Sequence, residues 1–322
     1  MNLKKKDLPI PIFFAVDDHY APYLAVAMRS LIDNADPDFQ YHIYILIDQL
    51  SEEHRANLSA MQTDRVKVEY VNVAERLSRI SSKLHLRDYY TKATYYRFFI
   101  PDLFPQYDRG VFLDCDIVVL GDISELYGCD LGNHLVAAVT DEVVTGIPTF
   151  ARYAEKVLGI PREEYFNAGI LVMNLKELRK VKIEKALVRL MAKHQFHVAQ
   201  DQDYLNVLCH RRTVYLDLKW NKTASPDSDP ERPPCIAHFK INFKPWKYDG
   251  VAYEEYFWQY AEKTVYYEQI KASKAQVTED DKEVDAQQYR NLLALAQSEI
   301  ALAEGNDYEV PLQFSLCRGM GM

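Results

Sequence analysis

Two carboxylates one residue apart, in Asp114-Cys115-Asp116, directly follow the short apolar run at residues 111–113. If the chain turns at this point, both carboxylates reach one divalent cation. Hard oxygen ligands that leave open positions suit Mg²⁺ or Mn²⁺ bound jointly with a diphosphate. A D-x-D triplet is also common as a solvated turn, and its position after a buried strand gives the metal interpretation equal weight.

His238 ends another apolar stretch and precedes Lys244. A histidine in such a place is usually a hydrogen-bonded structural residue, but with the two aspartates it becomes a candidate third ligand. A mixed set of two oxygens and one nitrogen shifts the preference from Mg²⁺ towards Mn²⁺. Lys244 would then place a point charge on a phosphate.

Two further polar groups are ambiguous by themselves. Asp201-Gln202-Asp203 opens a predicted helix, where the helix dipole favours acidic residues whatever the function. Asp17-Asp18-His19-Tyr20 follows the first apolar run and is equally consistent with an ordinary helix cap. Neither group decides the function on its own.

The elements that must position these residues alternate between two periodicities. Apolar runs at 10–16 and 42–47 and an alternating strand at 66–70 are separated by amphipathic helical segments, which predicts an α/β fold with a mainly parallel sheet. Later runs at 111–113, 135–139 and 169–173 are each followed by a carboxylate or an amide. Ligands bind at the carboxyl ends of strands in such sheets, so we expect these polar residues to share one rim.

The composition excludes several classes of protein. The chain has 322 residues and a net charge of −9, which disfavours nucleic acid and anionic lipid as main partners. No apolar run is long enough to span a bilayer, and the basic N-terminus lacks the apolar core of a signal peptide. The five cysteines contain no C-x-x-C, which favours a cytoplasmic location. No P-loop or G-x-G-x-x-G motif is present.

Taken in order, five segments resemble glycosyltransferase family 8: FFAVDDHYAPYLAVAMRSL, TYYRFFIPDLFPQYDRGVFLDCDIVVLGDISELY, YFNAGILVMNLKELR, DQDYLNVL and HFKINFKPW. The family includes bacterial lipopolysaccharide galactosyl- and glucosyltransferases and, more distantly, glycogenin. The resemblance covers about residues 9–260. It implies a GT-A fold with one Rossmann-like nucleotide-binding domain, and Mn²⁺-dependent transfer of galactose or glucose from a UDP-hexose with retention at the anomeric carbon.

The resemblance also implies roles for individual residues. Asp114 and Asp116 match the metal-binding D-x-D, with His238 as the third ligand and Lys244 on the diphosphate. The other implied donor contacts are Ala15, Val16, Asp17, His19 and Tyr20 around the nucleoside, Cys115 within the D-x-D, and Arg97, Asn167, Asp201 and Gln202 around the sugar. Of these, Asp201 and Gln202 are the candidate catalytic residues, with Asp201 on sugar hydroxyls and Gln202 on the β face.

Two positions depart from the family pattern. His19 stands where many members have asparagine. Ile241 replaces a glycine between His238 and Lys244, which removes close backbone approach to the phosphate unless the loop shifts.

Because Gln202 is an amide and a poor nucleophile, we expect same-face attack, in which the departing phosphate helps to deprotonate the acceptor.

Two alternatives remain open at this point. Asp114-Cys115-Asp116-Ile117-Val118 also fits a haloacid-dehalogenase-type phosphatase with Asp114 as nucleophile and Mg²⁺, although three α/β units precede the motif. A non-catalytic UDP-sugar-binding relative is supported only by Ile241.

We expect a GT-A domain at 1–262 and a helical C-terminal extension at 263–322. The acceptor is a saccharide, a lipid-linked glycan or a glycoprotein. The amphipathic tail helix is compatible with a homodimer.

Overall fold

The structure is a computed structural model that describes residues 9–80, 92–226, 228, 234–305 and 308–316. The basic residues 1–7, on which the signal-peptide expectation rests, lie outside these ranges. The chain divides into two compact units that are interleaved along the sequence. The first unit comprises residues 1–74, 110–130 and 217–282, and the second unit comprises residues 75–109, 131–216 and 283–322.

Four parallel strands form the core of the first unit, in the order β3-β2-β1-β4. Their bounds are β1 Ile10–Ala15, β2 Tyr41–Ile47, β3 Val66–Asn72 and β4 Gly110–Leu113. Because β1 is paired on both edges and covered on its faces, its sequence is a continuous apolar run, and Ile12, Phe13 and Phe14 are fully buried. The expected mainly parallel arrangement is confirmed for these strands.

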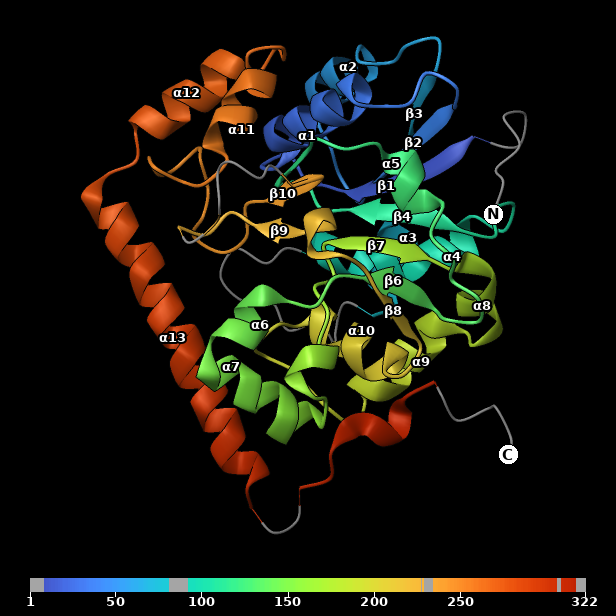
Figure 1. Cartoon of the computed structure of the whole chain (residues 1–322), viewed down its shortest axis with the longest axis vertical. Coiled ribbons are helices and arrows are strands. Elements are labelled where there is room, and N and C mark those ends of the chain that lie inside the picture. Colours follow the sequence, from blue (N-terminus) through green and yellow to red (C-terminus); the bar gives the residue numbers. More distant parts are fainter. Residues whose placement is uncertain (1–8, 81–91, 227, 229–233, 306–307, 317–322) are drawn as a thin grey trace. The chain divides into compact units, whose positions relative to one another are not determined.

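A smaller sheet in the same unit has the order β5-β10-β9, formed by Ile117–Val119, Ile236–His238 and Lys222–Thr223. The helices of this unit are α1 Ala21–Asp33, α2 Glu52–Ser59, α5 Ile123–Tyr127, α11 Glu254–Ala261 and α12 Tyr267–Ala275, with the 3-10 turn η5 Leu218–Trp220. Helix α1 packs against β5 and α11 (Figure 1).

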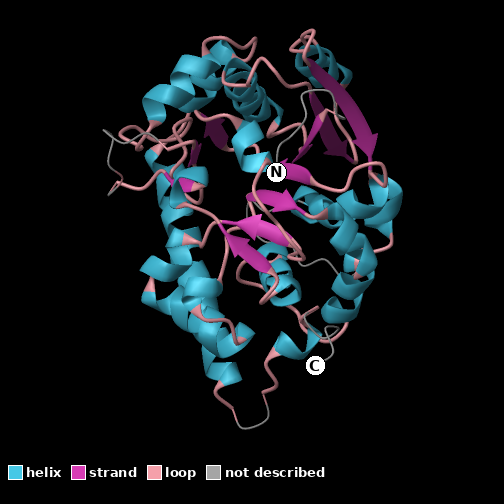
Figure 2. Ribbon diagram, turned by 45° about the vertical axis from the view of Figure 1, so that its right-hand side comes forward, coloured by secondary structure: helices cyan, strands magenta, loops and turns pink. Residues whose placement is uncertain are grey.

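The second unit contains three strands in the order β7-β6-β8, formed by Ile170–Met173, Val136–Ala138 and Thr213–Tyr215. Strand β6 is antiparallel to β7 and parallel to β8. Six α-helices of the described chain belong to this unit; Figure 2 colours helices cyan and strands magenta. The α-helices are α4 Ile100–Leu103, α6 Glu142–Gly146, α7 Pro148–Tyr153, α8 Leu175–Lys180, α9 Ile183–Met191 and α10 Asp201–Cys209.

Short turns and two boundary helices complete the described chain. The turns of the second unit are η2 Lys92–Phe99, the π-helical η3 Ala154–Leu158, η4 Arg162–Glu164 and η6 Pro311–Phe314. Helices α3 Ala74–Ser78 and α13 Glu279–Ala303 each contain residues of both units. Among the residues described, no helix is both long and apolar enough to cross a membrane.

The aromatic-rich pattern of residues 253–270 predicts one helix, whereas the structure has two helices in this segment. Helix α11 ends at Ala261 and α12 begins at Tyr267. Between them Thr264 Oγ1 donates to Ala261 O and accepts from Tyr266 N, so the side chain competes for backbone groups that a continuous helix would use. The aromatic pattern of the segment conceals this break.

Candidate functional site

Strand register brings the three candidate metal ligands together in the first unit. Strand β4 ends at Leu113, the chain turns through Asp114 and Asp116, and β5 begins at Ile117. Strand β10 pairs antiparallel with β5, and its last residue, His238, lies opposite Ile117. The imidazole is therefore next to the turn that carries both carboxylates.

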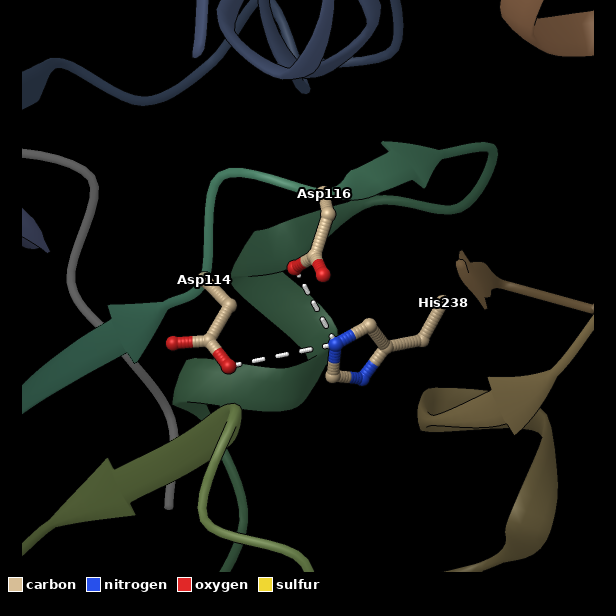
Figure 3. Close-up of side chains that lie close together, drawn as sticks. All are labelled: Asp114, Asp116 and His238. Atoms are coloured by element: carbon tan, nitrogen blue, oxygen red, sulfur yellow. Dashed lines mark ion pairs between the residues drawn. The ribbon is translucent and has the colours of Figure 1, made fainter. Parts of the chain in front are cut away.

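The three side chains converge on one point (Figure 3). His238 Nε2 lies 3.2 Å from Asp116 Oδ1 and 3.8 Å from Asp114 Oδ2. One ligand atom from each residue lies within 4.8 Å of the other two. This spacing and this donor set fit a divalent cation that keeps open positions for another ligand.

A hydrogen bond fixes which nitrogen of His238 faces the carboxylates. Nδ1 lies 2.9 Å from Asn221 Oδ1, which can only accept, so Nδ1 carries a proton. Nε2 is then the ring nitrogen that faces Asp114 and Asp116, and it would offer its lone pair to a bound cation. Metal-bound histidines are held in this way by a partner on the other ring nitrogen. The residues present therefore fit a metal ion.

Lys244 pairs with one of these carboxylates, that of Asp116. Its Nζ donates to Asp116 Oδ2, while the ring of Trp246 lies 5.4 Å from the ammonium and stacks on Tyr23 at 4.0 Å between centroids. Burial would raise the pKa of Asp116, but Lys244 and His238 together hold it well below its usual range. Asp116 is therefore ionised at physiological pH.

The loop that connects His238 to Lys244 keeps the backbone conformation of a glycine despite Ile241. The φ angle of Ile241 is 53°, in the left-handed region, and Phe243 N donates to Lys240 O at 3.0 Å to close the turn. Ile241 therefore occupies a backbone conformation that favours glycine. Lys244 reaches Asp116 from this turn.

The residues predicted around a nucleoside lie at the carboxyl end of β1, also in the first unit. Ala15 O accepts from Cys115 Sγ at 3.3 Å, which ties the end of β1 to the turn after β4. Asp17 Oδ1 accepts from Tyr20 N at 3.0 Å. The His19 ring packs edge-to-face against Tyr20, with centroids 5.6 Å apart. Val16 is buried and His19 is exposed.

The residues predicted around a sugar form a second cluster, within the second unit. Arg97 Nε lies 3.3 Å from Asp201 Oδ2, and both side chains are buried. Arg97 also donates to Thr94 O and Ala168 O. The ion pair holds the first residue of α10 against the segment that precedes β7.

Asn167 and Gln202 are joined in this second cluster by Asp141, the carboxylate after the apolar run at 135–139, to which the sequence assigned no role in binding. Asp141 Oδ2 accepts from Asn167 Nδ2 at 2.8 Å and from Gln202 Nε2 at 3.2 Å. Its other oxygen caps α6 by accepting from Val143 N. The signal was available, because Asp141 follows an apolar strand as Asp114 does.

Each predicted residue thus lies in one of two clusters, one per unit. The metal ligands, Lys244 and the residues after β1 belong to the first, and Arg97, Asn167, Asp201 and Gln202 belong to the second. That the two clusters share one rim and bind one donor stays a prediction.

Comparison with known proteins agrees with this chemistry. General stress protein A of Bacillus subtilis (strain 168) is 27% identical over 266 residues, which cover 75% of this chain and 89% of that protein. Lipopolysaccharide 1,2-glucosyltransferase of Escherichia coli (strain K12) is 28% identical over 216 residues, 65% of this chain and 61% of that enzyme. The chain therefore spans less than two thirds of the latter relative.

A solved structure supports the same fold. The galactosyltransferase LgtC, in complex with donor and acceptor sugar analogs, matches with a TM-score of 0.67 and 28% identity, covering 80% of this chain and 96% of that chain. The α/β architecture with mainly parallel strands is thus the GT-A fold. The model of glycosyl transferase family 8 matches residues 11–250, which is most of the sequence. The chain belongs to glycosyl transferase family 8.

Proposed function

We propose that the protein transfers galactose or glucose from a UDP-hexose to a saccharide or glycoconjugate acceptor, with retention and with Mn²⁺. The observation that carries the proposal is the Asp114, Asp116 and His238 cluster, with the histidine tautomer set by Asn221, in a member of this family. The names of two relatives, a glucosyltransferase and a galactosyltransferase, support both hexoses.

Asp114, Asp116 and His238 are the residues that would hold the metal ion. When bound, a divalent cation supplies positive charge to the diphosphate that leaves. Lys244 adds a second positive charge and is itself held over Trp246. A set of two carboxylates and one imidazole favours Mn²⁺ over Mg²⁺.

The second cluster would bind and orient the hexose. Asp201, held by Arg97, offers a carboxylate to sugar hydroxyls, and Asn167 offers an amide. Gln202 would lie at the β face, where an amide supports positive charge but is a weak nucleophile. Same-face attack therefore fits this chain better than a double displacement. Ala15, Val16, Asp17, His19, Tyr20 and Cys115 would contact the nucleoside.

The phosphatase alternative gains nothing from these observations. It needs Asp114 as a nucleophile, yet His238 Nε2 faces both carboxylates and the family match extends far on either side of them. The proposed place of action is the cytoplasm, on lipopolysaccharide or another cell-surface glycan. A lipid-linked glycan and a glycoprotein are the acceptor classes to screen, and a homodimer is the proposed assembly to examine.

Thermal unfolding with UDP, UDP-glucose or UDP-galactose, each with Mn²⁺, Mg²⁺ or a chelator, tests the proposal. A nucleotide at 100 times its Kd stabilises the native state by about 2.7 kcal/mol. We expect stabilisation that requires Mn²⁺ and is lost in Asp116→Ala.

The control is Asp64→Ala, which changes an exposed aspartate of the first unit outside the cluster and should respond like wild type. If no uridine nucleotide stabilises the wild-type protein under any metal condition, the donor assignment is wrong. Release of phosphate from p-nitrophenyl phosphate with Mg²⁺ would then support the phosphatase.

A further inference from the structure

Asp203 is a completely buried carboxylate for which the proposed function gives no role. It lies in the first turn of α10, one residue after Gln202, and its side chain has no exposure to solvent. Three donors converge on it: Ala199 N and Tyr153 Oη on Oδ2, at 2.9 and 3.0 Å, and Tyr165 Oη on Oδ1 at 2.7 Å. An ionised carboxylate can only accept, so all three must donate.

The hydroxyl of Tyr165 transmits this requirement to Gln202. Burial and the neighbouring Asp203 raise the pKa of Tyr165 well above its usual range, so the hydroxyl keeps its single proton. That proton goes to Asp203. The oxygen of Tyr165 is then left to accept, and it faces Gln202 Nε2 at 3.2 Å. The side of the carboxamide that faces Tyr165 must therefore be the NH₂ group.

The opposite side of the carboxamide has the matching requirement. Gln202 Oε1 accepts from Ala168 N at 3.0 Å and from Asn167 Nδ2 at 3.1 Å. The backbone N–H of Ala168 cannot change roles. If the carboxamide were flipped, its NH₂ group would face the N–H of Ala168. Its oxygen would face the oxygen of Tyr165, whose only proton already goes to Asp203. Both ends therefore select the same orientation.

We propose that Tyr165 and Asp203 are positioning residues that fix the orientation of the Gln202 carboxamide. The inference rests on the proposed function, in which Gln202 lies at the β face of the hexose. Asp203 sets the direction of the Tyr165 proton, and Tyr165 acts with Asp141 and the N–H of Ala168 to set which atom of Gln202 is presented. Neither residue needs to touch the sugar for this to control turnover.

Proton uptake by Asp203 would reverse the chain of hydrogen bonds. Burial raises the pKa of Asp203 to about 6, against the opposing effect of its three donors. Once protonated, Asp203 can donate to Tyr165, whose own proton then turns towards the NH₂ of Gln202. Tyr165 then no longer selects the NH₂ side of Gln202, and only Ala168 N–H and Asp141 hold the orientation, so kcat should decline below about pH 6. The other ionisable groups that interact with Asp203 are Glu299, which pairs with His197, and the tyrosines Tyr95, Tyr204 and Tyr308.

Tyr165→Phe and Tyr153→Phe form a matched pair of variants. Each removes one hydroxyl that donates to Asp203, but only Tyr165 also contacts Gln202. With UDP-glucose and UDP-galactose and Mn²⁺, we expect Tyr165→Phe to lower kcat for UDP release by about tenfold, the equivalent of one hydrogen bond, with KM little changed. Tyr153→Phe should leave kcat within about twofold of wild type. Equal losses in the two variants would overturn the proposal.

The two variants should differ in how kcat depends on pH. In Tyr153→Phe the link to Gln202 is intact and one donor to Asp203 is gone, so the acid limb of kcat should move to higher pH. In Tyr165→Phe the link is cut, so the limb that belongs to Asp203 should disappear. An unchanged acid limb in Tyr165→Phe would show that Asp203 does not act through Tyr165.

A stability cycle tests the link without any nucleotide. Tyr165→Phe is combined with Gln202→Met, which keeps a similar side-chain volume and removes the amide. We expect Tyr165→Phe to lower the thermal midpoint less in the Gln202→Met background than in wild type, whereas Tyr153→Phe should lower it equally in both.

The cycle separates the two ways in which the assays can fail. If the wild-type protein releases no UDP but the cycle shows coupling, the proposed function fails and the orienting link stands. If the wild-type protein is active and the cycle shows no coupling, the inference fails and the proposed function stands.

Discussion

Ile241 is a β-branched residue in a conformation that suits glycine. Its φ of 53° places Cβ close to the following carbonyl, which costs roughly 1–2 kcal/mol for an L-residue. The turn from Lys240 to Phe243 persists nevertheless, and strain of this kind is retained where the surrounding structure demands it. Here the demand comes from the two ends of the turn, His238 and Lys244, which both face Asp116.

At residue 241 we expect the usual order of stability between alanine and glycine variants to be reversed. Ile241→Gly and Ile241→Ala remove nearly the same side chain, but only alanine keeps the strained Cβ. We expect the glycine variant to be more stable than the alanine variant by about 1 kcal/mol, although glycine is ordinarily the less stable of the two. Chemical denaturation of both variants measures the difference. A more stable alanine variant would mean that residue 241 is not left-handed in solution.

At the scale of single residues, the sequence identifies a site residue where a suitable ligand type stands directly after an apolar run or at its end. Asp114, Asp116 and His238 each follow or end an apolar run, and the structure brings them together. Asp203 could not be selected in this way. Acidic residues at a helix start are common and usually solvated, and the burial of Asp203 depends on Tyr153 and Tyr165, which lie far away in sequence.

At the scale of elements, the three-stranded sheet β5-β10-β9 is what positions the imidazole. Strand β10 places His238 opposite Ile117, and β9 follows directly after Asn221, so the partner of Nδ1 is held by the same sheet. The orientation of His238 is therefore set by backbone pairing on one side and by a single side chain on the other.

Asn221 should therefore control metal affinity without being a ligand. We expect Asn221→Ala to weaken Mn²⁺ binding by about tenfold, because the ring loses the partner that fixes its tautomer. Asn221→Asp keeps an acceptor for Nδ1–H and should retain most of the affinity. Isothermal titration with Mn²⁺ in the absence of nucleotide compares the two. Equal affinities for the alanine and aspartate variants would contradict this role.

Helix boundaries were less predictable than helix identity. The apolar spacing from Tyr289 onwards predicts one helix that stops near Gly305, whereas α13 ends at Ala303 and begins ten residues before Tyr289, at Glu279. Its start is a reciprocal cap, in which Asp281 N donates to Thr278 Oγ1 and Thr278 N donates to Asp281 Oδ2. The first turns are polar, so hydrophobic periodicity could not reveal them.

At the scale of the whole molecule, the last described residues pack on the second unit. Leu316 N donates to Leu208 O and Ser315 Oγ donates to His210 O, which satisfies carbonyls at the end of α10. The domain boundary that the sequence predicts lies at residue 262. That boundary stays a prediction. The two units are interleaved along the chain, and such an arrangement leaves no local signature in the sequence.

Removal of residues 306–322 should destabilise the protein. Helix α10 carries Asp201 and Gln202 at its start, and the deletion would leave two carbonyls at its end without their present donors. Two lost hydrogen bonds correspond to about 2 kcal/mol, or a fall of about 5 °C in the thermal midpoint. Differential scanning calorimetry of the shortened and full chains tests this. An unchanged midpoint would mean that α10 does not depend on the tail.

The ligand set of Asp114, Asp116 and His238 has a practical consequence for preparing the protein. Sites with nitrogen and oxygen ligands follow the Irving–Williams order, so Ni²⁺, Cu²⁺ and Zn²⁺ bind more tightly than Mn²⁺. Protein isolated on an immobilised-nickel column would therefore carry the wrong ion. Chelation followed by reconstitution with Mn²⁺ should come before any assay, because otherwise a lack of activity would reflect the bound ion and not the residues of the site.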